Sequence, residues 1–329
     1  MSVLISAKNL SKQYRVRKRS GGLFKSFVAP QTTIVDALKE VSFSISQGEL
    51  VGYIGPNGAG KSTTVKILSG ILRPDGGQCS VLGMTPWVER RQVVARIGVV
   101  FGQRSQLWWD LPVTDSFSLL RDIYRVPQNE FLRTRDELID RLTLSPLLDT
   151  PVRQLSLGQR MRCELAASLL HSPPILFLDE PTIGLDAISK LAVRDFIKQR
   201  NRQQGMTVIL TTHDMDDIEA MCTRVLLIGK GQILMDGSVQ DLLSERHERR
   251  ITATLENPIP TDCLPADVSM RNPQGQDWTL RFDPAIIPVP EVIAILNERC
   301  GIVDVMVENP PIDEVVAKRY TQLEQEEVI

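Results

Sequence analysis

Long apolar runs, paired cysteines and a large net charge are all missing from this sequence of 329 residues. Nowhere do about eighteen apolar residues follow one another, which excludes an ordinary membrane-spanning helix. The first residues contain no apolar run of signal-peptide length. Five cysteines are scattered without a CxxC pair, so neither a disulfide framework nor a structural zinc site is indicated. A net charge of −2 gives no reason to expect a nucleic-acid partner. We therefore expect a cytoplasmic protein, one that would act on a membrane only from outside the bilayer.

The pattern of apolar residues predicts two domains, 1–243 and 244–329. In the first, short apolar strands such as Leu50–Ile54 and Ile175–Leu178 alternate with helices, which is typical of a mostly parallel sheet covered on both faces. Beyond residue 243 a charged stretch leads into short strands and a helix over Pro290–Cys300, with many prolines between them. We expect a small α+β domain there, with a last helix near Ile312–Gln322.

One segment between the first predicted strands stands apart from this pattern. Arg15–Thr33 carries five basic residues and no acidic ones, together with a Gly-Gly pair and a proline. It is interpreted as a loop or hairpin insertion. Solvated basic side chains and contact with anionic lipid headgroups are both compatible with its composition.

A phosphate-binding loop is the strongest motif. It lies between the predicted strand Leu50–Ile54 and a helix predicted over Lys61–Leu72, which is the context that GxxxxGK[ST] requires. Glycines let backbone N–H groups approach phosphate oxygens closely, and the helix N-terminus adds partial positive charge. Lys61 is expected on the β- and γ-phosphates and the Ser62 hydroxyl on Mg²⁺. The nucleotide-binding residues are Gly55, Pro56, Asn57, Gly58, Ala59, Gly60, Lys61, Ser62 and Thr63.

Two acidic residues, Asp179 and Glu180, end the apolar strand that starts at Ile175. A carboxylate at the end of a buried strand is costly unless a cation compensates its charge. Opposite a phosphate-binding loop, Asp179 is expected in the Mg²⁺ shell and Glu180 on the attacking water. A strand that merely runs into an acidic turn is the plainer interpretation of this segment taken alone.

Further motifs follow in the order that marks one family. They are a run that resembles the signature LSGGQ, a Q-loop glutamine, a D-loop aspartate, a switch histidine and an aromatic residue suited to stack on adenine. In this sequence they are Leu155, Ser156, Leu157, Gly158 and Gln159, then Gln103, Asp186, His213 and Tyr14. Each is weak alone, but together with the two motifs above they resemble the ATP-binding cassette (ABC) ATPases over residues from about 3 to 243.

The resemblance implies a fold and a mechanism. The fold is a P-loop α/β cassette with a mostly parallel core sheet, an antiparallel β subdomain and a helical subdomain. Two cassettes pair head to tail, and the signature loop of one covers the ATP of the other. Glu180 then acts as base or water-orienting group, His213 contacts the γ-phosphate, and Gln103 touches metal or water. Leu157 departs from the family, which usually has glycine there, and a working site requires its side chain to point away from the nucleotide.

The segment Phe101–Pro112 resembles the ATPase subunits of ABC-2-type exporters, in a longer branch with a C-terminal extension. Trp108 and Trp109 follow the Q-loop, where such subunits receive a helix of the membrane-spanning permease. Packing of both tryptophans inside the helical subdomain is the alternative. The resemblance implies an ATPase that powers transport at the inner face of the cell membrane, with ATP and Mg²⁺ as cofactors, bound to separate ABC-2-type permease subunits.

Two questions stay open at this point. The second cassette is either another copy of this chain or a different one. A non-transport ABC ATPase of the translation or DNA-repair type is the rival class. One P-loop, and about 120 compact residues between it and the acidic strand, argue against that class.

Overall fold

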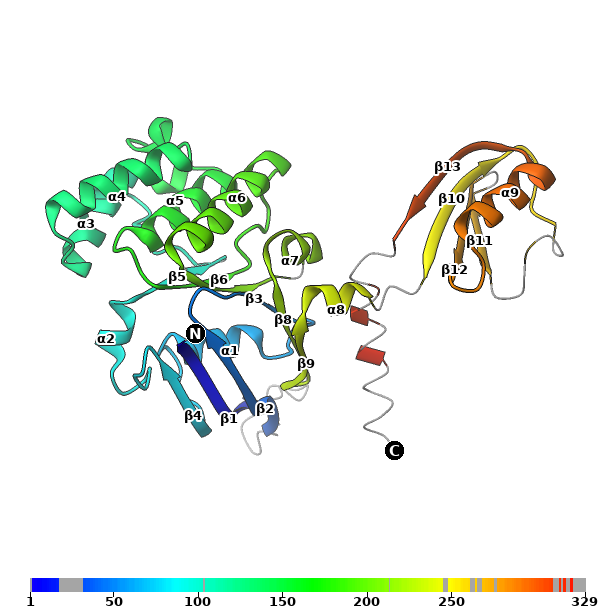
Figure 1. The fold of residues 1–329 in the computed structure, drawn as a ribbon. Coiled ribbons are helices and arrows are strands. Elements are labelled where there is room, and N and C mark those ends of the chain that lie inside the picture. The colour runs from blue at the N-terminus through cyan, green and yellow to red at the C-terminus, as the bar shows by residue number, and fades with distance from the viewer. Residues whose placement is uncertain are drawn as a thin grey trace, which may run out of the picture. The chain divides into compact units, whose positions relative to one another are not determined.

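A computed structural model describes residues 2–17, 32–102, 104–212, 214–244, 248–260, 264, 268–274, 277–309, 314, 316–317 and 320–321. The contacts divide the chain into two compact units, 1–237 and 238–329. Each unit has its own sheet or sheets, and each is described by itself (Figure 1). The boundary predicted after residue 243 differs from this division by six residues.

The first unit is built on a six-stranded sheet of order β5-β6-β7-β3-β8-β9. The pairs β5–β6, β6–β7, β7–β3 and β3–β8 are parallel. Every residue of β3 and β7 is buried, as expected for parallel strands that are covered on both faces. The strands are β3 (Leu50–Ile54), β5 (Ile97–Phe101), β6 (Ile175–Asp179), β7 (Thr207–Thr211), β8 (Arg224–Gly229) and β9 (Gln232–Ser238).

A second, three-stranded sheet of order β2-β1-β4 is antiparallel throughout. Its strands are β1 (Val3–Arg17), β2 (Thr32–Ser46) and β4 (Gly76–Val81). The sequence predicts strands over Val3–Ile5 and Val35–Ser46; the first prediction is much too short, because four register shifts along the β1–β2 pair interrupt the alternation of apolar and polar residues. The predicted insertion Arg15–Thr33 therefore begins and ends in strand, and residues 18–31 lie outside the described part of the chain.

Helices of the first unit cover the parallel sheet and form a helical group of their own (Figure 1). The predicted helix Lys61–Leu72 ends earlier, at Leu68, because Gly70 has a φ of +71° and turns the chain away. Arg125, with a φ of +55°, separates α3 from α4. The α-helices are α1 (Lys61–Leu68), α2 (Arg90–Val94), α3 (Val113–Tyr124), α4 (Gln128–Arg141), α5 (Leu157–Leu169), α6 (Ala187–Gln204) and α7 (Met215–Met221), and short 3₁₀ turns span Ser145–Leu147 and Val152–Gln154.

The second unit is an α+β unit with an antiparallel sheet of order β11-β12-β10-β13. Helix α9 (Val289–Cys300) buries Val292, Leu296 and Cys300 in one cluster with Ile251 and Leu280 of the sheet. Its other elements are α8 (Val239–Ser244), β10 (Arg249–Leu255), β11 (Ser269–Gln274), β12 (Asp277–Phe282) and β13 (Ile302–Glu308). Most of the helix predicted near Ile312–Gln322 lies outside the described residues.

His171 fixes the end of α3 against the sheet. Its ring stacks on Tyr124, with centroids 3.9 Å apart and planes 4° from parallel, and its Nε2 donates to the Ile97 carbonyl at 3.0 Å. Its Nδ1 is buried and has no partner among the described residues. Burial lowers the pKa of His171 from 6.5 to about 4, although the bond to Ile97 opposes that shift. The imidazole is therefore neutral at physiological pH.

This buried histidine predicts acid sensitivity. Above pH 6.5 it is neutral in both the folded and the unfolded chain; between pH 6.5 and about 4 only the unfolded chain takes up the proton. Stability should fall across that window as the pH falls, by about 3 kcal/mol for this one group. His171→Phe, which keeps the stack on Tyr124, should flatten that part of the dependence of the unfolding free energy on pH, measured by urea denaturation. An unchanged pH profile would contradict a buried neutral His171.

Candidate functional site

The phosphate-binding loop joins β3, near the middle of the sheet, to α1 (Figure 1). Gly58 and Gly60 have φ values of +83° and +113°, which L-residues with side chains rarely adopt. A Cβ on Gly60 would lie 2.5 Å from the Ala37 carbonyl oxygen, so only glycine fits at this position. No side chain caps the first turn of α1. Its N–H groups can therefore be offered to an anion.

Lys61 begins α1 and folds back over the loop. Its Nζ donates to the carbonyl oxygens of Gly55 at 2.6 Å and Pro56 at 3.1 Å, and the residue is buried. Burial lowers the pKa of Lys61, and the charges of Glu180 and Asp179 partly oppose this. The ammonium group thus lies where loop and carboxylates meet, which is the position from which a lysine binds phosphate oxygens.

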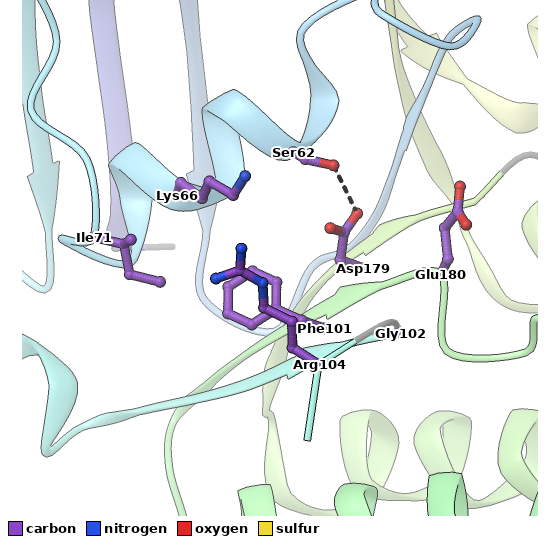
Figure 2. A pocket seen from close by; sticks show the side chains of 8 residues that line it. All are labelled: Ser62, Lys66, Ile71, Phe101, Gly102, Arg104, Asp179 and Glu180. Carbon is purple, nitrogen blue, oxygen red and sulfur yellow. Dashed lines mark hydrogen bonds between the residues drawn. The ribbon is translucent and has the colours of Figure 1, made fainter. Parts of the chain in front are cut away.

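Asp179 and Glu180 come together with the loop at the carboxyl ends of the parallel strands. Asp179 ends β6 and accepts hydrogen bonds from the Thr211 hydroxyl, at the end of β7, and from Ser62 Oγ at 3.4 Å (Figure 2). Glu180 has a φ of +55°, and its N–H donates to the Thr211 carbonyl at 2.9 Å. A non-glycine residue in the left-handed region is strained, and such strain gathers at functional sites. The backbone thus fixes the direction in which the Glu180 side chain leaves the strand.

The residues around Asp179 fit Mg²⁺. Ser62 and Asp179 offer a hydroxyl and a carboxylate, the oxygen ligands that Mg²⁺ prefers. In the described part of the chain no group of three or more His, Cys, Asp or Glu residues could hold a metal. This is compatible with an ion that takes one or two protein ligands and completes its shell with phosphate and water. Gln103, the third predicted ligand, lies outside the described residues, as does His213.

An open hollow of about 320 Å³ lies beside Ser62 and Asp179. Figure 2 shows Lys66 and Arg104, two cations that the motifs do not include, directed into it. Lys66 lies one helical turn after Ser62, so the spacing could have indicated it. Arg104 reaches the hollow through the turn after β5, which the sequence pattern does not reveal. The lining residues are Ser62, Lys66, Ile71, Phe101, Gly102, Arg104, Asp179 and Glu180.

Tyr14, the predicted adenine-stacking residue, lies on β1 opposite Val35 in the antiparallel sheet. Its side chain is 37% exposed. An exposed ring can receive a base on its face. Loop residues Pro56 and Asn57 are exposed as well, whereas Ala59 is buried and Thr63 is intermediate.

The signature run begins α5. Ser156 caps the helix: its Oγ accepts from Gln159 N at 3.2 Å, while Gln159 Oε1 accepts from Ser156 N at 2.9 Å. This reciprocal capping box fixes the entry to the helix. The hydroxyl accepts in this bond, so its own proton stays available for another acceptor. Leu155 precedes the cap in an extended conformation.

Leu157 packs against the turn that holds the predicted D-loop. A Cβ built on Gly184 would lie 2.3 Å from Leu157 Cδ2, and Gly184 has a φ of +69°. Asp186, two residues on, caps α6 by accepting from Ser189 N at 2.9 Å. The pKa of the Asp186 carboxyl is lowered, chiefly by that hydrogen bond from the Ser189 N–H. In this structure the leucine that replaces the usual glycine is directed to its own D-loop turn.

A network of ion pairs joins α6 to the residues from Asp214 to Asp217. Lys190 Nζ lies 2.6 Å from Asp214 Oδ2, and Arg194 Nε lies 2.5 Å from Asp217 Oδ1. Asp217 is fully buried and also accepts from the Thr182 hydroxyl. Because Thr182 follows Glu180 closely and Asp214 follows position 213, the network ties these two segments to α6. Sequence motifs alone do not reveal it.

Known proteins are similar to this chain in sequence. The model of the ABC transporter family matches residues 38–183. The chain is 32% identical to the "ABC transporter ATP-binding protein NatA" of Bacillus subtilis over 65% of its own length and 87% of that protein's. It is 35% identical to the "Daunorubicin resistance ATP-binding protein DrrA3" of Streptomyces coeruleorubidus, over 67% and 69%. It is also 32% identical to the "Methionine import ATP-binding protein MetN" of Geobacillus kaustophilus, over 80% and 79%.

A solved structure agrees with these relatives. A dimeric, post-hydrolysis state of the ATP-binding cassette MJ0796 with ADP and Pi superposes with a TM-score of 0.61 at 27% identity, over 71% of this chain and 98% of that one. The fold is that of an ABC ATPase cassette. This chain belongs to the ABC transporter ATP-binding proteins: it is an ATPase that uses ATP with Mg²⁺. Within the described residues, each helix is too short or too polar to cross a membrane.

The contact between Leu157 and Gly184 is testable. Gly184→Ala places a methyl group against Leu157 at a strained φ, so it should displace Leu157 and lower the ATPase rate on the order of tenfold. Gly205→Ala is the matched control, because Gly205 has a φ of +63° and nothing within 4 Å of its would-be Cβ. Both variants should lose about 1 kcal/mol of stability. Adding Leu157→Ala should restore part of the rate to Gly184→Ala only. Equal ATPase rates in the two glycine variants would show that the contact does not matter to the site.

Proposed function

We propose that this chain is the ATPase subunit of an exporter, working as a dimer of cassettes on separate ABC-2-type permease subunits at the inner face of the cell membrane. The observation that carries the proposal is the exposure of Trp108 and Trp109 directly after the Q-loop position, at 37% and 52%. Exposed aromatic side chains are typical anchors for a partner helix. The name of the daunorubicin-resistance relative supports export, whereas that of the methionine-import relative speaks for the opposite direction.

The segment that carries the tryptophans is firmly held, as a docking surface requires. Trp108 N donates to Ser116 Oγ at 3.2 Å, and the Trp109 carbonyl accepts from Arg153 N at 3.0 Å. The Arg160 guanidinium lies 5.7 Å from the centroid of a Trp109 ring, within the range of a cation–π contact. A rigid surface costs less ordering entropy when a partner binds.

Each group around the loop then has a role in hydrolysis. Lys61 and the N–H groups of α1 bind the phosphates, while Ser62 and Asp179 hold Mg²⁺. The bound ion neutralises charge on the phosphate oxygens. Glu180, fixed by its bond to Thr211, orients the attacking water and accepts its proton. We assign Gln103 and His213 the metal-or-water and γ-phosphate contacts implied by their motifs.

The signature run serves the second cassette. The Ser156 hydroxyl proton and the N–H of Gly158, at the N-terminus of α5, are proposed to bind the γ-phosphate held by the partner's loop. Leu155, Leu157 and Gln159 shape that turn. Asp186 lies near it, because Leu157 packs against Gly184, two residues before Asp186. Binding of two ATP molecules closes the dimer and hydrolysis reopens it, a population shift driven by ligand. Residues 1–243 form the cassette and 244–329 an accessory domain in this proposal.

The first experiment is purification of tagged Glu180→Gln from detergent-solubilised native membranes with ATP and Mg²⁺. Without its base the chain should bind ATP, stall before hydrolysis and stay dimeric. Mass spectrometry should then find one or two polytopic membrane proteins in fixed ratio. Co-purified ribosomal or DNA-associated proteins, or the chain by itself, would overturn the transport assignment. Normal ATP turnover by Glu180→Gln would overturn the role of Glu180.

A second test concerns the tryptophans. Trp108→Ala combined with Trp109→Ala should reduce the recovery of the permease from those membranes about tenfold or more, since aromatic anchors dominate such interfaces. Trp87→Phe is the control, because Trp87 packs against the core cluster of the cassette. A shift of the melting temperature on adding ATP reports whether each variant is folded. Full recovery of the permease with the double variant would place the docking surface elsewhere.

A further inference from the structure

Glu164 is a buried carboxylate that the mechanism above does not use. It lies on α5 and is 4% exposed. Its Oε1 accepts a hydrogen bond from the Ser105 hydroxyl, and its Oε2 accepts from Gln106 N at 3.1 Å. Gln106 Nε2 in turn donates to the Glu164 carbonyl at 3.0 Å. A buried charge is costly unless it is hydrogen-bonded in this way.

These bonds join two parts of the cassette that are about sixty residues apart in sequence. We call residues 104–111 the docking segment. Ser105 and Gln106 lie near its start, and the exposed tryptophans and Leu111 lie near its end. Glu164 lies eight residues after the cap Ser156, about 12 Å along the helix axis. The helix that presents the signature run is therefore fastened at its middle to the docking segment.

The same segment is also fastened on the other side of the signature run. Val152 N donates to the Leu111 carbonyl at 3.1 Å, and Arg153 N donates to that of Trp109 at 3.0 Å. Both donors precede Leu155, whereas Glu164 and Arg160 follow Gln159. The signature run thus lies between two attachments to one segment. A displacement of that segment can therefore act on the signature run from both sides.

We propose that Glu164 is a positioning residue: it fastens the docking segment to α5, so that displacement of Trp108 and Trp109 by a membrane subunit moves the signature run against the partner's ATP. The inference rests on the proposed function, in which those tryptophans meet a permease and the signature run meets ATP. Coupling of this kind is reciprocal. Closure of the cassette dimer on ATP therefore also changes the surroundings of the two tryptophans.

That reciprocity supplies a test on the full chain. Trp87→Phe and Trp278→Phe leave Trp108 and Trp109 as the only fluorescent indoles of the four tryptophans, in the Glu180→Gln background that keeps ATP bound. Adding ATP and Mg²⁺ should shift the emission as the dimer forms. Glu164→Ala should still form the dimer, seen by size-exclusion chromatography, but lose the shift. Glu130→Ala, which removes an exposed carboxylate from α4, should keep it.

Ser105→Ala tests the same contact at an exposed residue, where a substitution carries less risk of a folding defect than Glu164→Ala. It removes one of the two hydrogen bonds to the carboxylate described above, the one from a side chain, and should give a shift between those of the parent and Glu164→Ala. A full shift in Glu164→Ala, or no shift in a parent that does form the dimer, would overturn the inference alone. A parent that forms no dimer with ATP would overturn the proposed function and this inference with it.

Discussion

The charge of Asp179 at the end of a buried strand is the constraint around which the cassette is organised. The four residues before Asp179 on β6 are buried, so its carboxylate needs compensation where the strand emerges. Ser62 from α1 and Thr211 from β7 supply hydrogen bonds, and Lys61 supplies a positive charge. All of these groups lie at the carboxyl edge of the parallel strands, where open α/β sheets bind their ligands. The site is therefore a consequence of strand order.

Glu180 shows how that edge extends into the rest of the cassette. Its left-handed φ turns the chain sharply after β6, and two residues later Thr182 donates to the buried Asp217. Asp217 pairs with Arg194 of α6, the helix that Asp186 caps. The D-loop, the acidic strand end and the segment around position 213 are thus parts of one bonded network. Side-chain bonds therefore tie the turn after the acidic strand end to α6.

Much of the fold and of the site can be predicted from the sequence, because the features concerned are local. The phosphate loop and the strand ending in Asp179 each depend on residues within a few positions of one another, and each forms as predicted. The long β1–β2 pair was underestimated because its register shifts interrupt the alternation on which strand prediction depends. Thr211 and Arg104 join the site, and Glu164 joins the segment that holds the tryptophans, only through contacts between distant segments. No spacing in one sequence reveals such contacts.

The departure of Leu157 from the usual glycine has a consequence for how such sequences diverge. Its side chain rests on Gly184, so a cassette that acquires leucine in the signature run can no longer accept a side chain in that turn. Conversely, a lineage can replace Gly184 only after a smaller residue has replaced Leu157. The two positions, twenty-seven residues apart in the chain, are expected to change in a fixed order during evolution. Alignments of this branch should show that order as correlated substitution.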